Sequence, residues 1–288
     1  MSGCAGVRPY NVRLDERLSA FIVAHPDDWQ LFMGDVAVDE ASRHRPVLFV
    51  YLTTGGADRS VEYWHSREAG GLASAYAAAN FDSAASSEAP PSDCGQVAIQ
   101  KHMVMRCNYA NTVSYFLRLP DGAVEGTGFA VTQMQSLKKL QDGEIGVIDA
   151  VDGSATYQGW EDLSQTVGSL LIREKQLSGA ESVQMHAPEP DADANPGDHS
   201  DHRAVGALVQ RVAAQYKFPA SYYIGYAISQ RRPNLSIKQA SAKMLVFMTY
   251  DQQRLNANRR WSAYAEEPAN YSSWLFRTYR HPEAEAAH

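Results

Sequence analysis

Histidine and aspartate side chains gather in two short clusters of this sequence, and these residue types can hold a metal ion. The first cluster reads AHPDD and the second reads HSDH, and their members are His25, Asp27, Asp28, His199, Asp201 and His202. A catalytic zinc ion takes three protein ligands from His, Asp or Glu and keeps a position open for water. The two clusters together therefore predict a metal site, although an HxxH pair alone would be a weak signal.

The spacing within the first cluster indicates which of its residues could bind the metal ion and which could act on a water molecule. His25 and Asp28 are three residues apart, and residues with this spacing at a turn entering a helix can converge on one ion. Asp27 is adjacent to Asp28 and cannot point the same way, so it is free to act on a water molecule. Pro26 restricts the backbone of the turn and helps to fix the geometry of the ligands.

Both clusters also have explanations that involve no metal. Adjacent aspartates at a helix N-terminus cap free backbone N–H groups and complement the helix dipole. His199 and His202 could be solvated residues of an acidic loop. Capping leaves His25 and Pro26 unexplained, and two clusters of the same composition favour metal binding. His186, also near a predicted strand end, is expected to be structural or to face the substrate.

Apolar runs of strand length alternate with helical patterns along the chain. Strands are predicted at 18–24, 46–54, 182–188 and 221–229, and helices at 31–44, 62–80, 161–177 and 202–216. Nearly continuous apolar strands are typical of parallel strands that are covered on both faces. The alternation predicts an α/β fold, with an open and mostly parallel sheet between two layers of helices.

Both clusters follow predicted strands, where functional groups of open α/β sheets collect. The first comes directly after 18–24, and the second follows 182–188 and a polar loop at 189–201. Another polar, proline-containing stretch at 81–95 is predicted to be a loop or an insertion. No internal repeat and no domain boundary is visible.

Composition narrows the class of protein. The chain has 288 residues, of which 44% are hydrophobic and 20% charged, as in ordinary globular proteins. A formal net charge of −7 argues against a nucleic-acid partner, because no basic surface is available to neutralise phosphates. No signal peptide and no membrane span is visible. Three scattered cysteines do not suggest a disulfide framework, so a reducing compartment and a cytoplasmic location are expected.

The two clusters resemble the two main motifs of the LmbE/PIG-L-like family of zinc-dependent N-deacetylases. Weaker similarities lie between them, and the similarity spans most of residues 18–250. The segments that carry it are AHPDD (24–28), TTGGADR (53–59), SREAGGLASAYAAA (66–79), LRLPDG (117–122) and HSDHRAVG (199–206). The 81–110 stretch matches nothing in the family.

The resemblance implies a Rossmann-like three-layer α/β sandwich and one Zn²⁺ ion per chain, with another divalent transition metal as the alternative. It implies a single domain over 1–288, with a core at about 18–250 and a C-terminal extension. The metal ligands would be His25, Asp28 and His202. Asp27 would be the general base, and His199 would stabilise the oxyanion or protonate the leaving amine.

The implied reaction is removal of an acetyl group from an N-acetylated amino sugar or glycoconjugate by an activated water molecule. The partner would be a small amino-sugar conjugate, and a homo-oligomer is possible. The alternatives are a catalytically inactive metal- or carbohydrate-binding protein of the same fold, and another metal-dependent hydrolase, an amidase or phosphohydrolase. Two imidazole ligands favour zinc over the magnesium of a phosphohydrolase.

Two positions depart from the family pattern, and three residues are candidates for substrate binding. Trp29 stands where many members have glutamate, and Ser200 stands where proline is common. Trp29 either lines a sugar-binding pocket or is buried in the core. Arg59 and Asp121 either bind sugar hydroxyls or form a surface salt bridge and a turn.

Overall fold

A sheet of eight strands runs through the part of the chain that the computed structural model describes, residues 17–82 and 93–281. The order of the strands across the sheet is β10-β9-β8-β1-β2-β5-β4-β3. Strands β9, β8, β1, β2 and β5 pair in parallel, whereas β10, β4 and β3 pair antiparallel with their neighbours. The proline-containing part of the predicted 81–95 loop lies outside the described residues.

Three of the four predicted strands are confirmed as central strands of this sheet. They are β1 (Arg17–Val23), β2 (Val47–Thr53) and β8 (Ser182–Pro188). Every residue of β2 is buried. An apolar run without alternation therefore corresponds to a parallel strand with helices on both of its faces.

The fourth predicted strand, 221–229, is right only for its first three residues. The strand is β9 (Ala220–Tyr223), and a 3₁₀ turn, η2 (Tyr226–Gln230), follows it. The backbone N–H of Gly225 donates to Asn195 Oδ1, and that of Tyr226 donates to Asp198 Oδ1. These side chains take backbone donors that a continuing strand would give to its neighbour.

Three predicted helices are confirmed, and one is divided. The confirmed helices are α3 (Val61–Ala79), α5 (Gly159–Ser178) and α6 (Ser200–Tyr216). The predicted helix 31–44 is instead two helices, α1 (Asp28–Phe32) and α2 (Gly34–Ser42). The break is at Met33, whose backbone (φ −138°, ψ 8°) is not helical.

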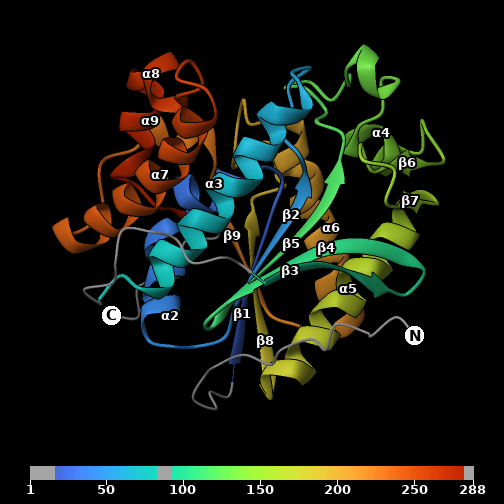
Figure 1. Cartoon of the computed structure of the whole chain (residues 1–288), viewed down its shortest axis with the longest axis horizontal. Helices are drawn as coiled ribbons and strands as arrows, with labels where there is room; N and C mark the ends of the chain where they lie inside the picture. Colours follow the sequence, from blue (N-terminus) through green and yellow to red (C-terminus); the bar gives the residue numbers. More distant parts are fainter. Residues whose placement is uncertain (1–16, 83–92, 282–288) are drawn as a thin grey trace.

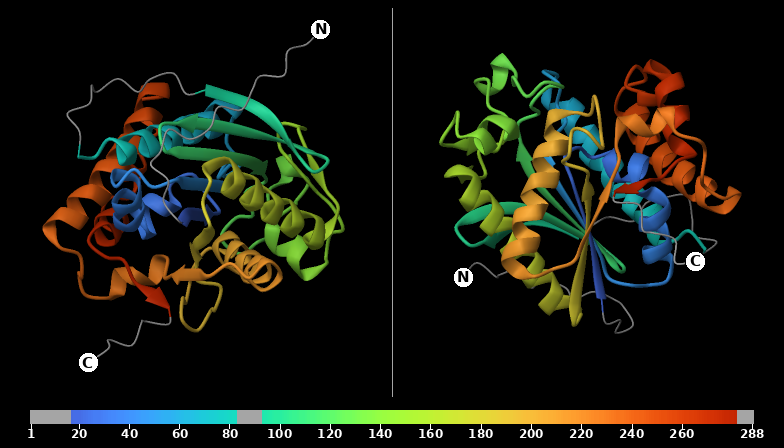
Figure 2. Two further views of the ribbon diagram at one scale, coloured as in Figure 1. Left: turned by 90° about the horizontal axis from the view of Figure 1, so that it is seen from below. Right: turned by 180° about the vertical axis from the view of Figure 1, so that it is seen from behind.

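The helices cover both faces of the sheet, so the fold is the predicted three-layer α/β sandwich (Figures 1 and 2). Helices α1, α2, α3 and α7 (Ile237–Ala257) pack on one face. Helices α4 (Leu137–Asp142), α5 and α6 pack on the other. Two buried apolar clusters, one on each side of the sheet, form the core.

The C-terminal part of the described chain extends the first helical layer. Two short helices, α8 (Ala263–Glu266) and α9 (Pro268–Leu275), follow α7, and β10 (Arg280–His281) returns to the sheet edge beside β9. None of the helices within the described ranges combines the length and apolar character needed to span a bilayer.

A hairpin occupies the described half of the 81–110 stretch. Strands β3 (Asp93–Ile99) and β4 (His102–Tyr109) pair antiparallel and extend the sheet beyond β5 (Thr112–Leu119). Their register places Cys94 opposite Cys107, and the two form a disulfide. The three scattered cysteines therefore do include a disulfide pair, and they no longer support the expected reducing compartment. The cytoplasmic location stays a prediction.

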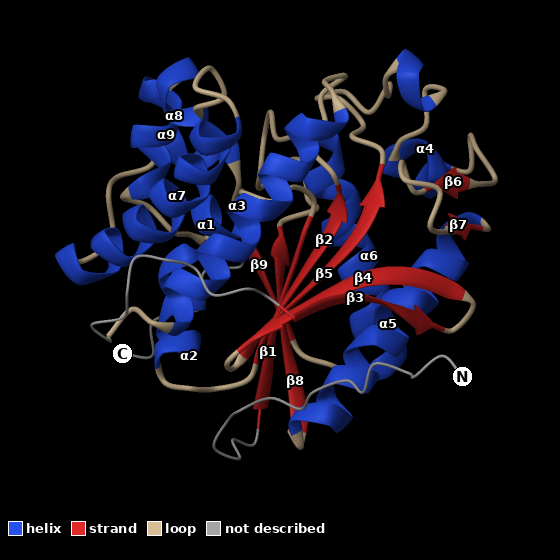
Figure 3. Cartoon of the chain, viewed as in Figure 1, coloured by secondary structure: helices blue, strands red, loops and turns tan. Residues whose placement is uncertain are grey.

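The carboxyl ends of the parallel strands point to one end of the molecule (Figure 3). Four neighbouring strands, β8, β1, β2 and β5, end there side by side. The AHPDD segment follows β1, and the loop that leads to HSDH follows β8. Parallel pairing thus brings the two clusters to the same edge of the sheet, as the sequence predicts.

Close packing of α3 on α7 explains Gly70, one of the two adjacent glycines in the middle of α3. A Cβ atom at Gly70 would lie 2.4 Å from Tyr250 Cδ2 and 2.9 Å from the Tyr250 backbone oxygen. We expect Gly70→Ala to destabilise the protein by about 1–3 kcal/mol, because rotation of the tyrosine ring cannot relieve the contact with its backbone. Urea denaturation measures this free energy.

Gly95→Ala is the matched control, since no atom lies within 4 Å of the position that its Cβ would take. We expect that variant to stay within about 0.5 kcal/mol of the wild type. Equal stability of the two variants would contradict the packing argument for α3 and α7.

Candidate metal centre

Three side chains from the two clusters meet at the edge of the sheet with their ligand atoms facing one another. His25 Nδ1 lies 3.3 Å from Asp28 Oδ1 and 3.2 Å from His202 Nε2, and the last two atoms are 3.1 Å apart. Zinc–ligand bonds of 2.0–2.1 Å in a tetrahedron would separate neighbouring ligand atoms by about 3.3 Å. The triangle therefore has the size of one face of a zinc coordination tetrahedron. All three residues are buried.

Asp27 and Asp28 do not act as caps of α1. Asp27 occupies the N-cap position, but its side chain makes no capping hydrogen bond. Asp28 Oδ2 instead accepts a hydrogen bond of 2.6 Å from the backbone N–H of His25. This bond closes the turn and directs the other oxygen of Asp28 toward the two imidazoles. The capping explanation therefore fails for this pair of carboxylates.

A carboxylate lies behind each of the two imidazoles. His202 Nδ1 donates to both oxygens of Asp198, at 3.0 and 3.1 Å. His25 Nε2 lies 3.4 Å from Asp201 Oδ2. Such outer carboxylates fix the ring orientation and the tautomer of a ligand histidine and increase its basicity. Here they leave His25 Nδ1 and His202 Nε2 free to bind a cation.

Two glycines make room for these outer carboxylates. A Cβ atom at Gly225 would lie 2.5 Å from Asp198 Oδ1, and one at Gly122 would lie 2.4 Å from Asp201 Oδ1. The backbone N–H of Gly122 also donates to Asp201 Oδ2 at 2.8 Å. Any other residue at these two positions would displace the carboxylates.

A second group of potential ligands shares His25 and includes Asp121, His199 and Asp201. Its atoms are farther apart, with His199 Nε2 4.0 Å from Asp121 Oδ1 and His199 Nδ1 3.8 Å from Asp201 Oδ2. Both oxygens of Asp121 already accept backbone hydrogen bonds. The set of His25, Asp28 and His202 therefore fits a zinc ion better.

The charges around the triangle favour a cation. Burial lowers the pKa of His25, but the negative charges of Asp28 and Asp201 outweigh it and raise this pKa to about 10. Asp198 and Asp28 likewise raise the pKa of His202 well above its usual value, against the effect of burial. The positions that hold protons so strongly are those that a divalent cation would take.

Asp27 forms an ion pair with Arg67, a residue of α3. Its Oδ1 accepts from Arg67 Nη2, and Arg67 Nη1 donates to the backbone oxygen of Gly55 at 2.8 Å. Asp27 lines the same cavity as His25 and Asp28. The guanidinium therefore holds the Asp27 carboxylate beside the metal ligands, where it takes no part in the ligand triangle.

His199 is the N-cap of α6 and is buried, so the alternative of a solvated loop histidine does not hold for it. Its Nδ1 accepts a hydrogen bond of 3.1 Å from the backbone N–H of Asp201. Burial and the positive charges of His25 and His202 lower the pKa of His199 to about 2. A neutral ring that accepts at Nδ1 carries its proton on Nε2. His199 therefore offers a hydrogen-bond donor to the cavity.

The cavity at the site has a volume of about 180 Å³, and aromatic side chains form part of its wall. Tyr226 comes from η2, and Tyr271 and Trp274 come from α9. The rings of Tyr226 and Trp274 stack with their centroids 5.0 Å apart. A flat aromatic wall beside a polar floor suits a ligand with an apolar face, such as a sugar ring.

The three residues expected to bind substrate have different surroundings in the structure. Trp29 is fully buried; it stacks on Phe49 and donates from Nε1 to the Tyr51 hydroxyl at 2.8 Å. It offers no surface to a ligand, so we do not retain that role. Arg59 pairs with Glu266 at 3.5 Å. Asp121 lines the cavity, but it also has the structural role of a turn residue.

Sequence similarity identifies the family of this chain. The family described as PIG-L, GlcNAc-PI de-N-acetylase, matches residues 20–213. The chain belongs to this family. All three members of the triangle, together with Asp27 and His199, lie within the matched residues. Tyr226, Tyr271 and Trp274 lie outside them.

Solved structures with a similar fold include enzymes of different activity. A teicoplanin-pathway deacetylase has a TM-score of 0.48 and 15% identity, covering 88% of this chain and 93% of its own. The N,N'-diacetylchitobiose deacetylase of Pyrococcus horikoshii has a TM-score of 0.45 and 13% identity, covering 85% and 74%. A 4-carboxy-2-hydroxymuconate hydratase of Pseudomonas putida has 0.38 and 14%, covering 84% and 88%. None of the curated proteins compared with the chain matches it.

Two residues of the candidate site, Arg67 and Asp198, had signals in the sequence that the predictions did not use. Arg67 lies in the SREAGG segment that carries part of the family resemblance. Asp198 stands four residues before His202, a spacing that places two side chains together at the start of a helix. The aromatic residues of α9 had no comparable signal, because only the fold brings them to the site.

We expect Gly225→Ala to weaken zinc binding by about 10- to 100-fold, because the added methyl group displaces Asp198 from His202. Competition with a chromophoric chelator measures the affinity. Gly146→Ala is the matched control, with no atom within 4 Å of its added Cβ. Unchanged zinc affinity of Gly225→Ala would show that Asp198 does not support the ligand.

Proposed function

We propose that this protein is a zinc-dependent N-deacetylase that hydrolyses the acetamide of an N-acetylated amino sugar or of its conjugate. The observation that carries the proposal is the ligand triangle of His25, Asp28 and His202 with Asp27 beside it. Membership of a family described as a de-N-acetylase supports the choice of reaction.

The donor set fits zinc in number, type and size. Two imidazole nitrogens and one carboxylate oxygen are the ligands that a catalytic zinc ion commonly takes, and they leave a position open. When bound there, zinc would lower the pKa of a water molecule and polarise the acetamide carbonyl group.

Asp27 is the residue that accepts the proton of the attacking water. Arg67 binds Asp27 Oδ1, so we assign the proton to Oδ2. The bond to the guanidinium keeps the carboxylate oriented. After the attack, the same carboxyl group returns the proton to the amine as it leaves.

His199 stabilises the negative charge that develops on the carbonyl oxygen. Its neutral ring presents Nε2–H to the cavity, while Nδ1 is held by the backbone of α6. A fixed, neutral donor suits an oxyanion. Since the pKa of His199 is lowered to about 2, we assign the protonation of the amine to Asp27.

Substitution of His202 and of Asp27 separates metal binding from catalysis. We expect His202→Ala to lose bound zinc and activity together. We expect Asp27→Asn to retain zinc and to lose about 10²- to 10⁴-fold in kcat, because it cannot take a proton. Metal analysis and amine release from a panel of N-acetylglucosamine derivatives provide the two measurements.

Normal turnover by Asp27→Asn would overturn the assignment of the base. A wild-type protein that holds zinc and releases no amine from any substrate would favour the binding protein of the same fold. Release of phosphate from phosphomonoesters, with no release of amine, would favour a phosphohydrolase.

His199→Asn tests the oxyanion role without removing the cap of α6, because asparagine is a preferred N-cap residue. We expect kcat to fall by about 10²- to 10³-fold, with KM and zinc content nearly unchanged. A comparable rise in KM alone would instead mean that His199 binds the substrate in its ground state.

A further inference from the structure

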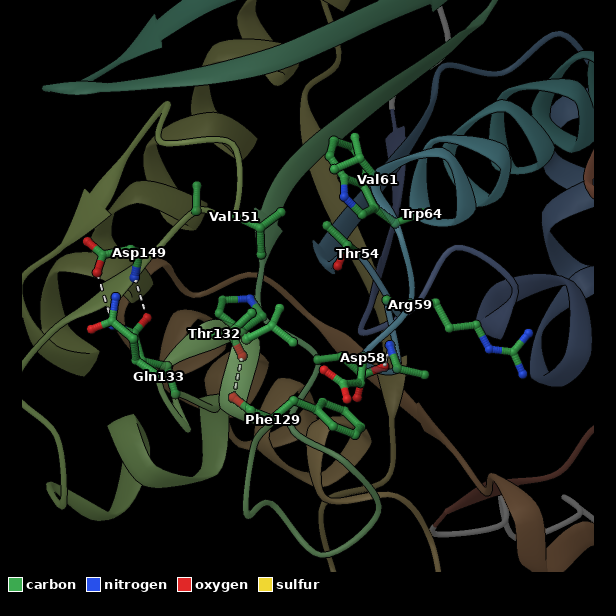
Figure 4. Close-up of a pocket in the computed structure, with 17 residues that line it drawn as sticks. Thr54, Asp58, Arg59, Val61, Trp64, Phe129, Thr132, Gln133, Asp149 and Val151 are labelled. Carbon is green, nitrogen blue, oxygen red and sulfur yellow. Dashed lines mark hydrogen bonds between the residues drawn. The ribbon is translucent and has the colours of Figure 1, made fainter. Parts of the chain in front are cut away.

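A second pocket opens directly beside the catalytic cavity. Its volume is about 270 Å³, and it shares Ala57 and Asp121 with the cavity that contains His25 and Asp27. We call it the side pocket; Figure 4 shows the side chains that line it. Ala57 and Asp121 therefore form the common boundary of the side pocket and the catalytic cavity.

Apolar side chains from three separate segments form much of the side pocket. They come from the start of α3, from the segment around η1 (Ala130–Thr132) and from the residues after β6 (Ile148–Asp149), and they are Val61, Trp64, Phe129, Val131 and Val151. Three of them are exposed valines: Val131 by 68%, Val61 by 55% and Val151 by 36%. Apolar surface gathered around a concave site indicates binding.

Several polar groups of the side pocket already have partners in the protein. Gln135 Nε2 donates to Asp149 Oδ2, and the backbone N–H of Asp149 donates to Gln135 Oε1, both at 2.9 Å. Thr132 donates to the backbone oxygen of Phe129. Asp121 accepts from the backbone N–H of Ala57 at 3.1 Å. These groups therefore have little need of a polar ligand.

The charges of the side pocket disfavour an anion. Three carboxylates line it, those of Asp58, Asp121 and Asp149. Arg59, its one cationic lining residue in the described ranges, pairs with Glu266 and lies over the ring of Tyr63 at 4.6 Å. Figure 4 shows the Arg59 side chain directed away from the other lining side chains. The three carboxylates would repel a phosphate or carboxylate group of a ligand.

We propose that the side pocket binds an uncharged apolar group, alkyl or aryl, carried by the amino-sugar substrate as its aglycone. This inference rests on the proposed function, because it places the acetamide in the catalytic cavity and the aglycone beyond Ala57 and Asp121. The side pocket thereby selects conjugates with an apolar aglycone over free or phosphorylated sugars.

The test compares the zinc-loaded enzyme on methyl and hexyl N-acetyl-D-glucosaminides, each as both anomers. We expect kcat/KM to be at least tenfold higher for a hexyl glycoside than for the methyl glycoside. The reason is that several methylene groups are transferred from water into the side pocket on binding. Val131→Asp should reduce this preference to about twofold or less and leave the methyl glycoside unaffected. Phe129→Ala is a second variant with the same expected result.

Ile237→Asp is the matched control, because Ile237 is 88% exposed at the start of α7 and does not line the side pocket. It should keep the full hexyl preference. Equal kcat/KM values for the two glycosides, or a preference that survives Val131→Asp and Phe129→Ala, would overturn the proposal.

Binding without turnover separates this proposal from the proposed function. Calorimetry with methyl and hexyl D-glucosides, which carry no acetamide, should show tighter binding of the hexyl compound by wild type and not by Val131→Asp. If that holds while no N-acetylated glycoside is deacetylated, the proposed function fails and the side pocket proposal stands. If amine is released but the hexyl group adds nothing to binding, the side pocket proposal fails and the proposed function stands.

Discussion

The parallel pairing of β1 with β8 is the constraint on which the candidate metal centre depends. It places residues 177 positions apart, His25 and His202, with ring nitrogens 3.2 Å from each other. The buried apolar residues of both strands hold this pairing. Since β2 and β5 end at the same edge, their following loops complete the surroundings of the site.

Burial of charged side chains is unfavourable unless hydrogen bonds or opposite charges stabilise them. In this site, successive shells of hydrogen-bond partners surround the buried charges. Behind the ligand triangle, Asp198 is itself held by Asn195 Nδ2 at 2.6 Å and by the backbone N–H of Tyr226 at 3.2 Å. Opposite it, Asp201 accepts from Gly122. The backbone therefore fixes the carboxylates, the carboxylates fix the imidazoles, and little rearrangement is required when a cation binds.

The sequence predicted those features that depend on local pattern or on a short motif. Continuous apolar runs identified the central strands, and the position of both clusters after strands predicted their convergence. Features decided by tertiary contacts were not predictable. Residues 224–229 look strand-like, but side chains from the 189–199 loop take the N–H groups of Gly225 and Tyr226. The Cys94–Cys107 disulfide likewise depends on the register of a hairpin, and no sequence motif predicted that hairpin.

The C-terminal helices contribute to the candidate site from outside the stretch that matches the family. The proposed metal ligands lie within residues 20–213, which match the family, whereas Tyr271 and Trp274 of α9 lie beyond them and line the same cavity. Substitutions in α9 can therefore reshape what the cavity admits without touching a ligand. The residues of the ligand triangle and this aromatic part of the cavity wall can thus change independently, because they belong to different stretches of the chain.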